Sequence, residues 1–350
     1  MNIKSYNQLI NKYRKKAITL FKSVKIKLRR WGHRWLKIAK SLFARVRKRI
    51  TAWWQIALMI IFCIIFLYYP FGGLLTHKID ISSYQAKNQN DNLFVIDSLS
   101  YLINRELHHH IWTPNLPFLF PSYFLDNMPN FQMGIVSAAS HTTNGLAKVS
   151  YTAASGKPSP YLEEAAKLLR YPPNIWLVSN QNSLLMATSS NTQYKKARRQ
   201  LNNFNRELAS GKILLPRDAT NFATILSAIN RDLAQLINAN SEHIREHSTD
   251  WFDFKADDVF YYAYGKLYAY LQITRNLSND FKDVLVKYDV YRQWTSFISL
   301  LDQAMLIKPS VVRNGALDSI FAPNHLAYLN NQVAQATNYL NVIIYKLQAN

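Results

Sequence analysis

An uncharged stretch at positions 52–75, AWWQIALMIIFCIIFLYYPFGGLL, constrains this chain more than any other feature. A helix needs about 20 mostly apolar residues to cross the roughly 30 Å hydrocarbon core of a membrane. Tryptophan and tyrosine side chains prefer the two membrane interfaces. Such side chains stand at both ends of the run, as Trp53 and Trp54 at one end and Tyr68 and Tyr69 at the other. The sequence therefore predicts a transmembrane helix over 52–75.

The charges beside this stretch predict its orientation. Residues 1–50 contain 17 Lys and Arg and no acidic residue, since Asp80 is the first acid in the chain. Positive charge is retained on the cytoplasmic side of a membrane, so we expect a cytoplasmic N-terminus and an exported C-terminal part. A cleavable signal peptide has a shorter basic region and a small-residue cleavage site. Here YYPF follows the apolar run, which favours an uncleaved signal anchor.

The basic arm, residues 1–51, has the pattern of an amphipathic helix. Apolar residues recur three and four positions apart along 21–46, and basic residues fill the other faces. A basic helix with an aromatic and aliphatic stripe is typical of one that lies on an anionic membrane surface. We expect anionic lipid headgroups as its partner, with nucleic acid the less favoured alternative. The residues expected at that membrane surface are Lys22, Arg29, Arg30, Trp31, Arg34 and Trp35.

The net charge of +21 belongs mostly to this arm, because the remaining residues hold 25 Lys and Arg against 21 Asp and Glu. The only cysteine, Cys63, lies in the apolar stretch. The exported part can therefore hold neither a disulfide nor a cysteine metal site. Residues 76–92 are polar and are predicted to be a linker. We expect 93–350 to form a mainly α-helical periplasmic bundle with irregular loops, as one domain or as two that meet near residue 250.

Local patterns predict the elements of this bundle. Residues 111–121 contain three prolines and predict an irregular loop. Residues 175–188 fit either short strands or packed coil. Apolar residues at helical spacing, with start and stop signals, predict helices over 93–110, 135–149, 161–170, 192–209, 218–247, 258–275, 280–305 and 324–348.

Three strings of residues resemble those of a known family. They are LDNMPNFQMG at 125–134, ADDVFYYAYG at 256–265, and NG…PNHL at 314–326. With the basic-flanked anchor, they resemble the uncharacterised proteobacterial inner-membrane proteins of domain of unknown function 2333, from the apolar stretch to the C-terminus. The segment 150–190 matches that family least well, and the basic arm is longer than is usual there. The resemblance implies a helical periplasmic domain anchored in the inner membrane, and it implies no activity.

Residues in and beside these strings are the candidates for a loop-formed cleft or an interface. Adjacent residues on a helix diverge by about 100°, so we expect Asp257 and Asp258 to cap a helix near Val259 rather than act on one atom of a substrate. We expect a turn at 126–127 and a cap at Asn324. The full set is Asp126, Asn127, Asp257, Asp258, Tyr261, Asn314, Asn324 and His325.

The run of three histidines at 108–110 beside Glu106 is the most conspicuous metal-like pattern. Ligands on a helix must be three or four residues apart to share a face, whereas adjacent histidines point in different directions. Solvated or packed histidines are therefore expected here. The chain lacks HExxH, P-loop, dinucleotide and nucleophile-elbow patterns. We accordingly predict no metal, no cofactor and no catalytic residue.

These observations favour a non-enzymatic, single-pass inner-membrane protein. Its periplasmic domain is expected to bind an envelope protein, as an accessory component of an envelope or secretion assembly does. The alternative is an envelope enzyme or a cell-wall-binding protein that uses Asp126, Asp257 or Asp258 in a cleft.

Overall fold

The computed structural model describes residues 3–76, 79–84, 92–124, 126–176, 188–247, 253, 255–309, 311–314 and 324–349. Within these ranges, side chains are described except at 3–28, 50–52, 74–76, 122 and 124. The chain divides into two compact units, Met1–Tyr68 and Tyr69–Asn350, which are treated separately below.

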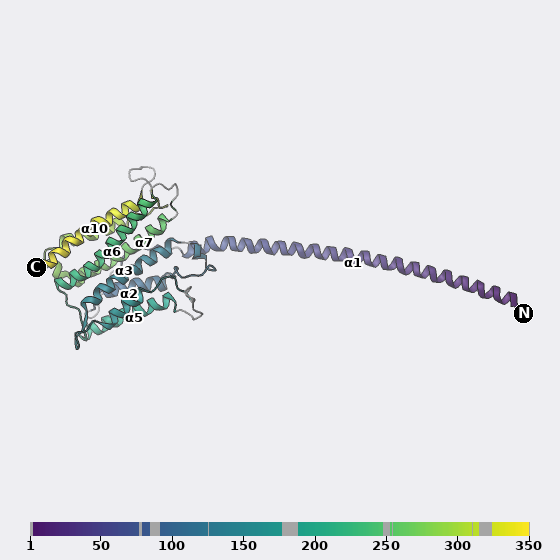
Figure 1. Cartoon of the computed structure of the whole chain (residues 1–350), viewed down its shortest axis with the longest axis horizontal. Coiled ribbons are helices and arrows are strands. Elements are labelled where there is room, and N and C mark those ends of the chain that lie inside the picture. Colours follow the sequence, from purple (N-terminus) through teal and green to yellow (C-terminus); the bar gives the residue numbers. More distant parts are fainter. Residues whose placement is uncertain are drawn as a thin grey trace. The chain divides into compact units, whose positions relative to one another are not determined.

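The first unit is formed by helix α1 (Ile3–Thr76), whose last residues belong to the second unit (Figure 1). Its segment Arg29–Gly73 is long and apolar enough to cross a membrane. None of its most apolar window is buried against the rest of the protein, unlike a core helix of a soluble domain. The arm and the apolar stretch thus form one continuous helix, which contains Pro70.

The second unit is mainly helical, as predicted. A π-helical turn, Arg105–His109, extends α2 (Phe94–Asn104), and a 3-10 turn, Pro121–Phe124, precedes α3 (Asn127–Val149). Two short antiparallel strands, β1 (Tyr151–Thr152) and β2 (Ile213–Leu214), are the only strands in the described ranges. The helices are α2 (Phe94–Asn104), α3 (Asn127–Val149), α4 (Pro160–Leu169), α5 (Ser190–Ala209), α6 (Ala219–Glu246), α7 (Ala256–Asp280), α8 (Lys282–Lys287), α9 (Tyr291–Ala304) and α10 (His325–Gln348).

Helices α3 and α7 form the centre of the bundle. Helix α6 packs on α3, and α10 packs on α6 and α9. On the other side, α2 packs on α7 and α5, while α4 packs on α3 and α5. Figure 1 shows α2, α3, α5, α6, α7 and α10 side by side. One hydrophobic core extends from Leu93 before α2 to Leu347 in α10. The predicted sub-boundary near residue 250 falls at 248–252, outside the described residues.

The crossing of α3 and α7 is so close that it requires glycine on both helices. A Cβ atom at Gly134 would lie 2.2 Å from the carbonyl oxygen of Tyr262. A Cβ atom at Gly265 would lie 2.0 Å from the carbonyl oxygen of Phe131. These two glycines end the strings at 125–134 and 256–265, so those strings pack against each other across the crossing.

Two predicted boundaries are wrong for local reasons. Helix α3 begins at Asn127 instead of residue 135, so the turn predicted at 126–127 is a helix start. Pro129 is tolerated there because the first N–H groups of a helix have no partner within it. The helix predicted over 280–305 is divided into α8 and α9, and Asp289 between them has a φ of 47°. Most of 175–188 lies outside the described residues.

Candidate functional site

The residues predicted to contact the membrane all lie on α1. Trp53, Trp54 and Tyr68 are exposed. Tyr69 is half-buried, and its hydroxyl donates a hydrogen bond to the carbonyl of Phe118 at 2.8 Å. The side chain of Lys22 is outside the described set. The other predicted arm residues are all exposed: Arg29, Arg30, Trp31, Arg34 and Trp35. The rings of Trp31 and Trp35 make an edge-to-face contact.

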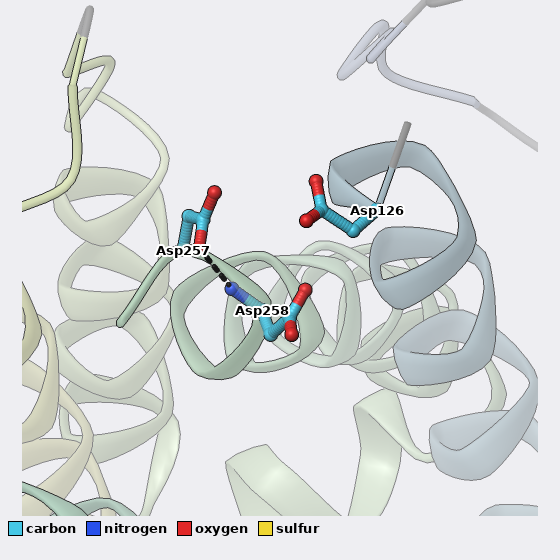
Figure 2. Close-up of side chains that lie close together, drawn as sticks. All are labelled: Asp126, Asp257 and Asp258. Atoms are coloured by element: carbon cyan, nitrogen blue, oxygen red, sulfur yellow. Dashed lines mark hydrogen bonds between the residues drawn. The ribbon is translucent and has the colours of Figure 1, made fainter. Parts of the chain in front are cut away.

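Three of the predicted cleft residues, Asp126, Asp257 and Asp258, come together at the starts of α3 and α7. Their carboxylate oxygens lie within 4.8 Å of one another. Figure 2 shows Asp126 facing the first turn of α7, which carries the other two. Partial burial raises the pKa of Asp257 and of Asp258, and the negative charge of Asp126 raises both further. Carboxylates are ligands for hard cations, but exposed acidic groups often gather without one, so we assign no ion here.

Neither Asp257 nor Asp258 caps α7, contrary to prediction. The N-cap is Lys255, without a side-chain cap bond. The two acids lie in the first turn, where negative charge favours the helix dipole. Asp257 Oδ1 accepts the N–H of Asp258 at 3.1 Å, and Asp258 Oδ1 accepts the Asn130 amide at 2.6 Å. Asn130 was not among the predicted site residues, although it lies one turn after Asp126 in the same string.

A second polar network joins the end of α6 to the start of α10. Asn324 caps α10 as predicted, and its Oδ1 accepts the N–H of Ala327 at 2.7 Å. Its Nδ2 donates to Asn314 Oδ1 at 2.8 Å. Asn314 Nδ2 in turn donates to Asp253 Oδ2 at 3.1 Å, and the same oxygen lies 2.8 Å from His243 Nε2 on α6. Asp253 also adds to the negative charge that raises the pKa of Asp257, which places the two networks close together.

The remaining predicted residues have local contacts. His325 Nδ1 accepts the N–H of Arg313 at 3.2 Å, and partial burial together with the Arg313 charge lowers the pKa of His325. Asn127 is the first residue of α3 and is half-buried. Tyr261 lines a different cavity, of about 660 Å³, which includes Asp80 and His110.

A polar cleft of about 660 Å³ lies between α3, α6 and α7, beside the three aspartates. Asn130 and Asp258 line it together with Glu242 from the last turns of α6. Asp232 and Lys266 also line it and are both buried. The cleft therefore connects the predicted acidic cluster with a buried ion pair that sequence reasoning did not find.

That buried pair is fully engaged within the protein. Lys266 Nζ lies 2.9 Å from Asp232 Oδ1, and the Tyr270 hydroxyl donates to Asp232 Oδ2 at 2.5 Å. His141 Nε2 lies 3.2 Å from Asp232 Oδ1, and burial is the largest influence that lowers the pKa of His141. Burial and the Asp232 charge raise the pKa of Tyr270. One signal was available: Asp232 follows Ile229 by three residues, on the apolar face predicted for this helix.

Asn240 is the second residue of the cleft that the sequence did not indicate. Its side chain is 1% exposed, and its Nδ2 has no hydrogen-bond partner among the described residues. A buried donor without an acceptor costs about 1–3 kcal/mol. This amide is thus available to an acceptor on a bound molecule, or to water.

Only one of the three consecutive histidines lies beside Glu106. His110 Nδ1 is 3.3 Å from Glu106 Oε2, whereas His108 and His109 are exposed at the π-helical turn. Arg105 Nε donates to Glu106 Oε1 at 2.7 Å. Burial alone would raise the pKa of Glu106, but His110 and Arg105 hold it below its usual value. The group is a buried ion-pair network at the end of α2.

The fold and the cleft define a helical-bundle protein with an N-terminal helix able to cross a membrane. Residues 217–342 match the model of a family described as an uncharacterized protein conserved in bacteria, DUF2333. The predicted family resemblance is confirmed over this range, which includes the strings at 256–265 and 314–326. The string at 125–134 lies outside the match. No curated protein and no solved structure matches the chain.

Proposed function

We propose that this is a single-pass bacterial inner-membrane protein whose helical domain lies in the periplasm and binds another envelope component in the cleft between α3, α6 and α7. The observation that carries the binding role is this polar cleft with the buried, unpartnered amide of Asn240. The apolar, unburied segment of α1 supports the anchor. The basic residues that precede that segment support the N-in orientation.

The charges of the cleft indicate the chemistry of its ligand. The charge of Asp232 is compensated by Lys266 at 2.9 Å. Asp258, Glu242 and Glu246 then leave the lining negative. Complementary charge favours association and suppresses wrong partners. We therefore expect a ligand that presents a positively charged group to these carboxylates and an acceptor to Asn240, as a basic segment of an envelope protein would.

The contacts of the acidic residues favour binding over catalysis. Both oxygens of Asp232 receive protein donors, and Asp258 accepts the amide of Asn130. These carboxylates therefore hold neighbouring side chains in place. The envelope-enzyme alternative needs one of them to be free to transfer a proton, and Asp258 is the group that would do so.

Crosslinking in cells tests the binding role. Full-length protein would be crosslinked, purified in mild detergent and analysed by mass spectrometry. Replacing two cleft acids, Asp258→Asn with Glu242→Gln, should reduce the yield of a stoichiometric envelope partner. The matched control removes two acids from α4, Glu163→Gln with Glu164→Gln, and should keep that yield. Equal yields from the two double variants would remove the cleft from the proposal, and absence of any partner would remove the binding role.

The topology is tested separately with C-terminal reporter fusions. An alkaline phosphatase fused after residue 350 should be active, since that enzyme needs export, and a cytoplasmic-type fluorescent reporter at the same position should stay dark. The opposite pair of signals would overturn the N-in orientation.

A further inference from the structure

A loop of the second unit exposes a run of large apolar side chains. The segment between Glu106 and Asp126 contains no Asp, Glu, Lys or Arg. Within it, residues 111–124 are called the apolar loop. Phe118 is 62% exposed and Leu119 is 64% exposed, and the neighbouring Phe120 and Tyr123 are exposed as well. Soluble proteins rarely leave a contiguous apolar patch of this kind in water, and such patches mark contact surfaces for proteins or membranes.

The base of the apolar loop is fixed to the bundle, so the exposed tip is held in place. The carbonyl of Ile111 accepts the Gln132 amide at 3.0 Å. Gln132 Oε1 accepts both the N–H and the hydroxyl of Thr113, at 2.9 and 2.8 Å. The buried Trp112 donates its indole N–H to the carbonyl of Pro173 at 3.0 Å. The start of the loop is therefore bound to the bundle by both side-chain and main-chain hydrogen bonds.

The tip lies against the exit end of the apolar stretch 52–75. Tyr69 donates its hydroxyl hydrogen to the carbonyl of Phe118 at 2.8 Å. Gly72 packs so closely on the loop that a Cβ atom there would lie 2.3 Å from Pro121 Cβ. Tyr69 and Gly72 belong to the same compact unit as the loop and are also the last part of α1. The loop tip thus contacts Tyr69 and Gly72, which belong to the part of the apolar stretch predicted to form its exit interface.

We propose that the apolar loop inserts its tip, Phe118 to Phe120, into the outer leaflet of the membrane that α1 crosses. The inference rests on the proposed membrane anchoring. Its physical basis is that a phenylalanine and leucine tip gains by leaving water, and that the contacts of Tyr69 and Gly72 place this tip beside lipid. Irregular backbone in contact with lipid is tolerated at the membrane interface but not in the hydrocarbon core. The tip also makes part of its backbone hydrogen bonds within itself. Phe120 N–H donates to the Pro117 carbonyl at 2.9 Å.

Depth-dependent fluorescence quenching on the full-length protein tests this proposal. The native Cys63 serves as the reference for the anchor. In a Cys63→Ala background, Leu119→Cys reports on the loop tip. Val286→Cys is the matched control, because this valine is 63% exposed and lies in α8, beyond the 25 residues of α7. Phe118→Cys provides a second tip position if Leu119→Cys lowers the yield of folded protein.

Each variant would carry an environment-sensitive fluorophore in vesicles of phosphatidylethanolamine and phosphatidylglycerol. Labels at 63 and 119 should shift to the blue and lose fluorescence with nitroxide acyl chains, while the label at 286 should respond to aqueous iodide. A label at 63 that is quenched by lipid, with one at 119 that responds to iodide, overturns the loop insertion and leaves the anchor. A label at 119 that is shielded from both quenchers overturns it too, because protein would then cover the tip. A label at 63 that escapes lipid quenching refutes the anchor and the insertion together.

Discussion

The α3–α7 crossing gives the sharpest stability prediction. Gly265→Ala would place a methyl group 2.0 Å from the oxygen, 2.7 Å from the carbonyl carbon and 2.8 Å from the Cα of Phe131. All three atoms belong to the backbone of α3, so no side chain can rotate away. Ordinary contact begins near 3.4 Å, and the two helices must therefore separate by more than 1 Å.

The size of the effect follows from two opposing contributions. Overpacking a core costs about 1–3 kcal/mol, and a clash between backbones belongs at the upper end of that range. Alanine in place of glycine favours a helix by about 1 kcal/mol. We expect Gly265→Ala to lower the free energy of unfolding by about 2 kcal/mol or more. At roughly 2–4 °C per kcal/mol, this lowers Tm by about 4–8 °C.

Thermal melts of the full-length protein in mild detergent measure this change. Gly145→Ala is the matched control, because its nearest new contact is Ala228 Cβ at 3.0 Å and its helix gains the same propensity. Its Tm should stay close to that of the wild type. Gly134→Ala should resemble Gly265→Ala. The double variant should lose less Tm than the two single variants lose together, since one separation of the helices relieves both clashes. A Tm for Gly265→Ala equal to that of Gly145→Ala would refute the reasoning.

Three further predictions concern single side chains. Burial raises the pKa of Asp280 to about 7 from 3.8. Its folded form then holds a proton that the unfolded chain has lost, so Asp280 contributes less stability as the pH rises from 4 to 7. The Tm of the wild type relative to that of Asp280→Asn should therefore fall over this range, and Tm curves that stay parallel would contradict the assignment. Asn324→Ala removes the cap of α10 and should cost about 1–2 kcal/mol of stability in the same melts. An unchanged Tm would show that the cap does not stabilise the helix. Asp258→Asn removes a charge that partial burial and repulsion from Asp126 disfavour more than the helix dipole favours it, while its amide oxygen can still accept from Asn130. It should raise stability by about 0.5 kcal/mol, less at high salt, and a lower Tm at low salt would argue against repulsion.

The helices of the bundle could be predicted because their information is local. Apolar residues three and four positions apart predicted which face of the long helix at 218–247 packs in the core, and Phe222, Ile229 and Leu233 are all buried. The final helix was predicted within one residue at its start, since Asn324 is a strong capping residue. The start of α3 was missed because Asp126 and Asn127, shortly before Pro129, suggest a turn, although a proline in the first turn loses no helical hydrogen bond.

The candidate cleft could be predicted only in part, because its contacts join residues far apart in the sequence. Asn130 and Asp258 are separated by 128 positions, and Asp232 and Lys266 by 34. Such pairs depend on which helices cross and at what rotation. A charged residue on an apolar helix face, as at Asp232, signals a buried partner but does not identify it.

Gln132 links two surfaces that have so far been treated separately. Its amide holds Ile111 and Thr113, at the start of the apolar loop, and the same helix contributes Asn130 and His141 to the wall of the cleft. A domain held by one flexible connection turns freely above a bilayer, whereas a domain held at two places keeps a constant orientation relative to the membrane. With the loop in the leaflet, α3 would fix the direction in which the cleft opens, and a partner would have to approach the membrane surface from one side.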